Sequence, residues 1–108
     1  MKIVLCNCSP AEAAALARAV VDGAVAACVN IVPGVTSVYW WDGKVCEDAE
    51  CTLLIKTSDD KVAALSDRLR ALHSYETPEI VVLDVDDAAS DPRYLAWVHA
   101  STHRLEPQ

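Results

Sequence analysis

The stretch over residues 26–57, AACVNIVPGVTSVYWWDGKVCEDAECTLLIKT, decides the fold of this chain. Two β-prone segments flank Asp42-Gly43, and this dipeptide is the strongest short signal for a β-hairpin. The arm over residues 44–57 would span about 46 Å if fully extended, whereas a globule of 108 residues is only about 34 Å across. The hairpin must therefore bend or project from the body. Because a projecting hairpin exposes strand edges that seek partners, the pattern favours an oligomer.

The segments around the hairpin indicate alternating strands and helices. An apolar strand is expected over residues 3–8, and the capping box Ser9-Pro10-Ala11-Glu12 then predicts a helix over residues 10–22. Within the hairpin, Pro33-Gly34 predicts a bend or bulge between segments 26–32 and 35–41.

The second half of the chain repeats this pattern. A helix with apolar residues every three or four positions is expected after a cap at Ser58, Asp59 or Asp60, and it ends before Pro78. A strand over residues 79–85 and a third helix starting at Asp91-Pro92 complete the order. We therefore predict one α+β domain over residues 1–108, with the ferredoxin-like order βαββαβ, an extended hairpin and a C-terminal helix. The uncovered face of such a sheet favours packing between subunits.

Composition narrows the partners and the compartment. Sixteen acidic against nine basic residues give a net charge of −7, which argues against nucleic acid and against an anionic membrane as partners. The sequence shows neither an 18-residue apolar run nor a signal peptide. The five cysteines are an odd number without a CxxC pair, and we expect reduced thiols in a cytoplasmic protein.

Five strings, in this order and at this spacing, resemble the CutA family of divalent-cation tolerance proteins. They are residues 27–34 (ACVNIVPG), 37–44 (SVYWWDGK), 54–57 (LIKT), 73–80 (HSYETPEI) and 94–97 (YLAW). The resemblance implies a ferredoxin-like homotrimer in the cytoplasm, similar in architecture to PII-type signalling proteins, with hairpin arms that pair across subunits. It also implies a link to tolerance of copper and other divalent metals, and no established catalytic reaction.

The resemblance also implies two sets of site residues. The copper-binding positions of the family match Cys6 and His73, and the cleft between subunits matches Cys28, Lys56, Tyr75 and Glu76. This chain departs from the family in two places. Leu72 stands where some members carry a second histidine, and Cys6-Asn7-Cys8-Ser9 has a different spacing into the first helix.

Each candidate residue also has a structural interpretation. Cys6 and Cys8 share a strand face, where they could bind Cu(I) or fill the core. His73 is expected at a helix end, where it could be a ligand or a structural residue. Lys56 could form an ion pair or bind an anionic metabolite.

Two further pairs are open to the same question. His99 and His103 have zinc-chelating spacing but fit a solvated helix face better. Trp40 and Trp41 are expected in a subunit interface rather than stacked on a ligand.

Three functional hypotheses result from these residues. The first is a trimeric protein that binds copper or another divalent cation through Cys6 and His73. The second is a PII-like small-molecule sensor that uses a pocket between subunits formed by Lys56, His73, Tyr75 and Glu76. The third is a scaffold that anchors another protein. The sequence carries no catalytic motif such as GxSxG or HExxH, and we expect a binding protein rather than an enzyme.

Overall fold

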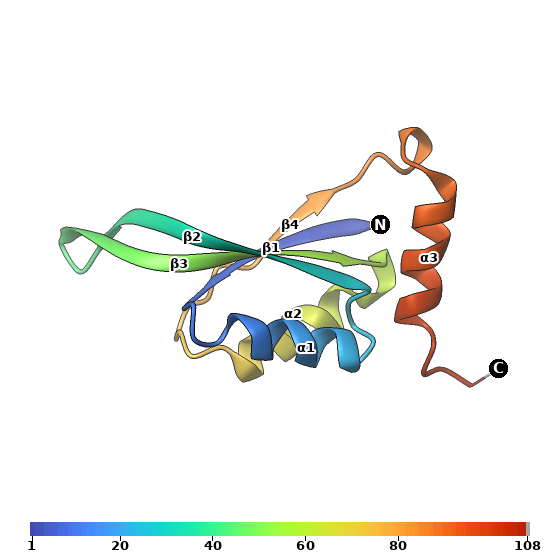
Figure 1. Cartoon of the computed structure of the whole chain (residues 1–108), viewed down its shortest axis with the longest axis horizontal. Helices are drawn as coiled ribbons and strands as arrows, with labels where there is room; N and C mark the ends of the chain where they lie inside the picture. Colours follow the sequence, from blue (N-terminus) through green and yellow to red (C-terminus); the bar gives the residue numbers. More distant parts are fainter. Residues whose placement is uncertain (108) are drawn as a thin grey trace.

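The computed structural model describes residues 1–107 and is 50 Å long, against 29 and 21 Å along its other two axes (Figure 1). The strands are β1 (Lys2–Cys8), β2 (Cys28–Trp41), β3 (Lys44–Thr57) and β4 (Val81–Asp84). The α-helices are α1 (Ala13–Asp22), α2 (Val62–Leu72) and α3 (Pro92–Thr102), with short 3₁₀ turns η1 (Asp59–Lys61) and η2 (Asp87–Ala89). This order confirms the predicted α+β, ferredoxin-like βαββαβ fold with a terminal helix.

The β2–β3 hairpin projects from the body and accounts for the elongated shape (Figure 1). Its turn has positive φ at both central residues, 51° at Asp42 and 75° at Gly43, as a two-residue turn that matches strand twist requires. The strand register shifts between Val32 and Val35, and Gly34 between them has a φ of 72°. The predicted hairpin and its Pro33-Gly34 bulge are therefore confirmed.

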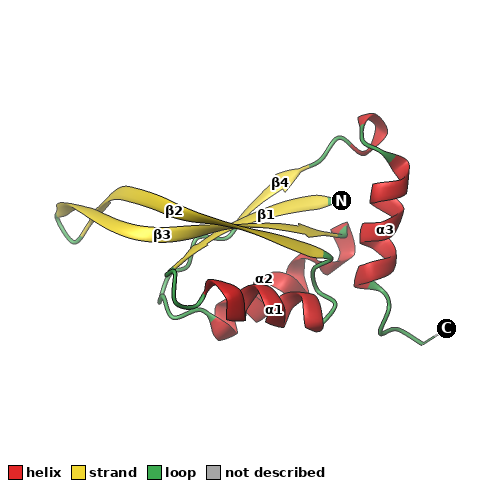
Figure 2. Cartoon of the chain, viewed as in Figure 1, coloured by secondary structure: helices red, strands yellow, loops and turns green. Residues whose placement is uncertain are grey.

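The sheet has the order β2-β3-β1-β4 with all neighbours antiparallel, and α1 and α2 cover one face (Figure 2). Alternate side chains of β1 and β3 point into the core between the sheet and these helices. The core includes Val4, Cys6, Cys8, Leu16, Val20, Leu53, Ile55, Leu65 and Leu69. The prediction that Cys6 and Cys8 share a face is correct, and that face is the core.

The opposite face of the sheet carries apolar side chains that α1 and α2 do not cover. Ile3 and Leu5 of β1 lie opposite Leu83 and Val81 of β4. Val81 and Leu83 are each 43% exposed, which is high for large apolar residues on a sheet. This exposed apolar face therefore favours packing between subunits, as the sequence pattern also did.

The start of α1 differs from the predicted capping box. The helix begins at Ala13, three residues later than expected, and no side chain caps its first turn. Ser9 Oγ instead donates to Glu12 Oε2 at 2.7 Å, because the Glu12 carboxylate turns toward the amide and hydroxyl of Ser74. A tertiary contact thus replaces the local cap.

Three other boundaries can be compared with the prediction. The side chain of Ser58 does not cap the second helix but bonds Thr102 Oγ1 at 2.6 Å. Strand β4 is shorter than the predicted 79–85, since it pairs only with the first half of β1. The third helix starts as predicted, with the Asp91 side chain accepting from the Arg93 amide at 2.8 Å.

Candidate functional site

His73 lies at the C-terminal end of α2, and its side chain is 0% exposed. Nε2 is 2.8 Å from the Asn7 carbonyl oxygen, and the Tyr75 amide donates to Nδ1 at 3.1 Å. An acceptor faces one ring nitrogen and a donor faces the other, so the neutral ring carries its proton on Nε2. Both nitrogens are therefore engaged within the chain.

Glu12 joins the end of β1 to the loop that follows α2. Its carboxylate accepts from the Ser9 hydroxyl at 2.7 Å and from the Ser74 amide at 3.1 Å, and it lies 3.4 Å from His73 Nδ1. Burial alone would raise the pKa of Glu12, but the hydrogen bonds from Ser74 and Ser9 outweigh it and lower this pKa. An ionised Glu12 therefore helps to hold the His73 ring and the following Ser74 in place.

The predicted metal ligands Cys6 and His73 approach the same atom. Cys6 Sγ lies 3.8 Å from the Asn7 carbonyl oxygen to which His73 Nε2 bonds. The thiol is 0% exposed, and burial raises the pKa of Cys6 to about 12 and that of Cys8 to about 11. Within residues 1–107, no group of three or more histidine, cysteine or acidic side chains is placed to hold a metal ion. Copper binding through Cys6 and His73 therefore stays a prediction, and in this arrangement the thiol is buried and both ring nitrogens are engaged within the chain.

A cavity of about 820 Å³ lies where the hairpin meets the loop between α2 and β4. It is lined by Asn7, Ser9, Ser37, Val38, Tyr39, Trp41, Asp48, Ala49, Glu50, Tyr75, Glu76, Thr77 and Glu79. Tyr75 Oη donates to Glu50 Oε2 at 2.8 Å across this cavity wall. Burial, with the hydrogen bond to Glu50, raises the pKa of Tyr75.

The cavity contains only half of the predicted pocket. Tyr75 and Glu76 line it, whereas Cys28 and Lys56 do not. These two residues pair across β2 and β3 at the end of the sheet near α3, on the face turned away from α1 and α2. There, burial and the neighbouring Cys28 raise the pKa of Tyr94 on α3.

Sequence reasoning missed the acidic wall of the cavity. Asp48 and Glu50 are two residues apart on β3 and so point to the same face. From the sequence alone, Glu47, Asp48 and Glu50 form a cluster of charges near the hairpin turn that suits an exposed arm which must not aggregate. The spacing of two between Asp48 and Glu50 indicates a shared strand face. The loop that meets this face has no periodic pattern, so its contact with these carboxylates could not be predicted.

A known protein family matches this chain over nearly its whole length. Residues 2–101 match the family model described as CutA1 divalent ion tolerance protein. The chain belongs to the CutA1 family. The divalent-cation tolerance protein CutA of Thermus thermophilus is 47% identical over 87 residues, which are 81% of this chain and 82% of that protein.

Solved CutA1 structures share the fold along nearly the whole chain. The structure described as PII-like protein CutA from Nostoc sp. PCC 7120 in apo form is 44% identical, has a TM-score of 0.92, and covers 95% of this chain and 98% of its own. The solved divalent cation tolerance protein of Thermus thermophilus is 44% identical with a TM-score of 0.87, covering 94% and 98%. The chain spans about half the length of the curated mouse and rice CutA proteins, 50% and 48%.

The two tryptophans next to the hairpin turn divide between two surfaces. Trp41 lines the cavity and is 58% exposed, whereas Trp40 is not among the lining residues and is 71% exposed. Consecutive residues of a strand point to opposite faces, which explains the division. Their predicted place in a CutA1 subunit interface stays a prediction.

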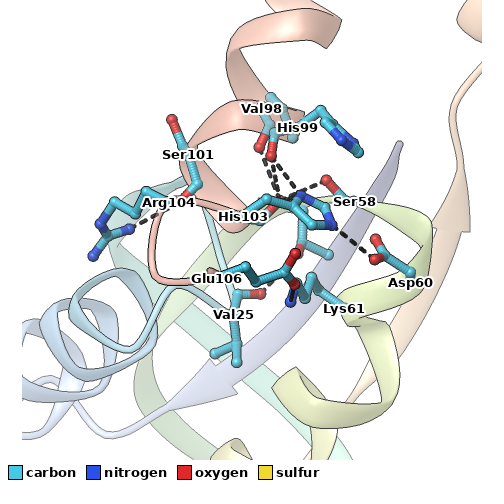
Figure 3. Close-up of polar contacts among 12 residues, drawn as sticks. Val25, Ser58, Asp60, Lys61, Val98, His99, Ser101, His103, Arg104 and Glu106 are labelled. Carbon is cyan, nitrogen blue, oxygen red and sulfur yellow. Dashed lines mark hydrogen bonds and ion pairs between the residues drawn. The ribbon is translucent and has the colours of Figure 1, made fainter. Parts of the chain in front are cut away.

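His99 of α3 and His103, which follows the last residue of α3, take part in a structural contact, shown in Figure 3. His103 Nε2 lies 2.8 Å from Asp60 Oδ2, and Nδ1 lies 2.6 Å from the His99 carbonyl oxygen. Acceptors face both nitrogens and favour the imidazolium, so Asp60 and the His99 carbonyl raise the pKa of His103. With the Lys61–Glu106 ion pair at 2.6 Å, this contact fixes the end of α3 against η1.

Within residues 1–107, no helix is both long and apolar enough to cross a membrane.

Proposed function

We propose that this chain is a cytoplasmic, self-associating protein that binds a ligand and contributes to divalent-cation tolerance. We propose further that the cavity at the base of the hairpin is its ligand site. The observation that carries the proposal is the lining of this cavity, where Tyr75 and Glu76 of the predicted pocket meet the nearly buried Glu50 of β3. The family description and the likeness to a PII-like protein support a binding role rather than catalysis. The five cysteines are free, which supports a reducing compartment.

Self-association, with a trimer as the predicted state, is part of this proposal. The projecting hairpin, the free edges of β2 and β4, and the uncovered sheet face support it. Cys28 and Lys56 stay predicted pocket residues, and they reach a ligand only if a second copy brings its cavity against that face. Native mass spectrometry at micromolar concentration tests the assembly, with Trp40→Ala as the interface variant. A monomeric wild type would contradict this part.

The ligand site is tested by calorimetry with a panel of divalent cations and small metabolites. Glu50→Gln removes charge from the cavity wall, whereas Glu47→Gln removes the same charge from a residue of β3 outside the lining. A ligand of the cavity should bind less tightly to the first variant and equally to the second. Equal losses in both variants would place binding elsewhere.

Copper binding through Cys6 and His73 is a second candidate function. Its support is the convergence of Cys6 Sγ and His73 Nε2 on the Asn7 carbonyl, together with the family's description. A soft thiolate and an imidazole suit Cu(I). The ring would first have to release the Asn7 carbonyl, and the buried thiol would have to lose its proton.

An anaerobic Cu(I) titration against a competing chelator tests this candidate. The variant is Cys6→Ser/His73→Ala with verified assembly mass, and Cys46→Ser is the control because Cys46 lies on the hairpin arm. Tight stoichiometric binding lost only in the double variant supports the site. Equal binding by all three proteins contradicts it.

A further inference from the structure

The cavity has a strongly one-sided charge. Four carboxylates line it, those of Asp48, Glu50, Glu76 and Glu79, and no lysine, arginine or histidine is among its lining residues. None of the ion pairs within residues 1–107 involves these four side chains. Asp48 accepts a hydrogen bond from the hydroxyl of Tyr39, which is a neutral donor. The cavity therefore collects negative charge that the described chain does not neutralise.

Glu50 shows that this is more than a solvated acidic surface. The residue is only 8% exposed, and its single hydrogen bond within the described chain comes from the neutral hydroxyl of Tyr75 to Oε2. Oε1 has no hydrogen-bond partner within the described chain, and because no fully buried side-chain oxygen there lacks one, Oε1 keeps some exposed surface on a residue that lines the cavity. A carboxylate with so little exposed surface gains from a cation at its free oxygen, and the described ion pairs supply none to Glu50.

The arrangement of the carboxylates suits an extended cation rather than a single ion. Asp48 and Glu50 follow one another along one face of β3, roughly 7 Å apart, and Glu76 and Glu79 come from the loop before β4. No three of these acidic groups converge enough to hold a metal ion, within residues 1–107. The negative charge is thus distributed along the cavity.

Aromatic side chains form the rest of the wall. Tyr39, Trp41 and Tyr75 line the cavity beside the carboxylates. Aromatic faces attract ammonium groups through their quadrupole, and they also pack against methylene chains. A wall of carboxylates and aromatic rings therefore matches a flexible chain with separated positive charges.

We propose that the cavity binds a linear aliphatic polyammonium ion, with one ammonium group at Glu50 and the methylene chain along Tyr39, Trp41 and Tyr75. The inference rests on the proposed function in that it takes this cavity as the ligand site, and it names the chemical class of the ligand. A metal ion in the cavity and Lys56 of a second copy are the competing occupants.

Calorimetric titration of the assembled wild-type protein with spermidine, a linear aliphatic triamine, tests the proposal. Octanediol serves as an uncharged chain of similar length. Glu50→Gln retains the shape and the acceptor for Tyr75 but removes the charge, and Glu79→Gln is a second variant if the first fails to assemble. Glu47→Gln, on the same strand outside the lining, is the matched control.

We expect saturable spermidine binding that weakens roughly tenfold or more in Glu50→Gln, as for loss of a charge-assisted hydrogen bond. Glu47→Gln should bind as the wild type does, and octanediol should not bind. Equal weakening in Glu47→Gln and Glu50→Gln would overturn the proposal, since it would mean non-specific attraction to a negative surface.

Two other results would overturn it while separating it from the proposed function. Binding of a divalent metal, but not of spermidine, with dependence on Glu50 would retain the cavity as the ligand site and refute the ligand class. Absence of spermidine binding until Lys56→Ala is introduced would place the lysine of a second copy in the cavity. Failure of every probe to depend on Glu50 would contradict both proposals.

Discussion

Replacement of His73 by leucine tests the central contact of the candidate site. The ring is wholly buried and serves two backbone groups, the Asn7 carbonyl at 2.8 Å and the Tyr75 amide at 3.1 Å. An unsatisfied buried polar group costs about 1–3 kcal/mol. The Asn7 carbonyl keeps only the weak contact from Cys6 Sγ at 3.8 Å and bears most of this cost, whereas Tyr75 is 37% exposed and its amide can partly recover water. We therefore expect His73→Leu to lower the free energy of unfolding by about 2–4 kcal/mol.

Urea unfolding measures this effect through the shift of the midpoint at unchanged slope. With a slope of about 1–3 kcal/mol per molar, typical of small proteins, the midpoint should fall by on the order of 1–2 M. Protein concentration must be equal in all samples, because assembly adds to apparent stability. His73→Gln, whose amide can donate to Asn7, should recover part of the loss, and Leu72→Ala is the control at the exposed neighbouring position. A loss under about 0.5 kcal/mol for His73→Leu, with assembly mass unchanged, would refute the reasoning.

Three other substitutions test the fold around this site. Asp60 raises the pKa of His103 in the folded chain. Their contact therefore stabilises the fold fully below the unfolded histidine pKa of about 6.5, and this stabilisation is lost as pH rises through the higher folded pKa. Asp60→Asn should flatten the dependence of the thermal midpoint on pH, measured from acid to mildly alkaline pH. Gly43 has a φ of +75° with open space around an added methyl, so Gly43→Ala should lower the free energy of unfolding by about 1–2 kcal/mol through backbone strain alone. Gly43→Asn should lower it less, and equal losses for the two variants in urea unfolding would contradict this. Leu53→Ala, in the fully buried centre of β3, should cost about 2–5 kcal/mol in the same assay, and a loss below about 1 kcal/mol would mean that the core collapses around the gap.

The elements of the fold could be predicted because their signals are local. Asp42-Gly43 determines the turn through its own backbone preferences, and Asp91-Pro92 starts α3 with a cap two residues away. The capping box at Ser9 failed for the opposite reason. Its Glu12 binds Ser74, 62 residues further along the chain, and such a distant competitor leaves no trace in the local pattern.

The candidate site could be predicted only in part because it combines strands with an irregular loop. Alternation along β3 correctly separates the face of Lys56 from the face of Ile55. The residues between α2 and β4 have no such period, and only the structure places Tyr75 and Glu76 against Glu50. The predicted pocket therefore divides between two regions of a single chain.

Which face of β1 meets the helices also determines the chemistry of its cysteines. Alternation shows that Cys6 and Cys8 share a face, and burial of Val4 beside them shows that this face packs against α1 and α2. Burial keeps these thiols protonated at neutral pH, since the pKa of Cys6 is about 12. A copper ion at Cys6 would have to displace that proton and the bond between His73 and Asn7 together. A cation at the proposed cavity site would instead meet Glu50, which lines the cavity and whose one described hydrogen bond comes from Tyr75, and no buried thiol would have to lose its proton.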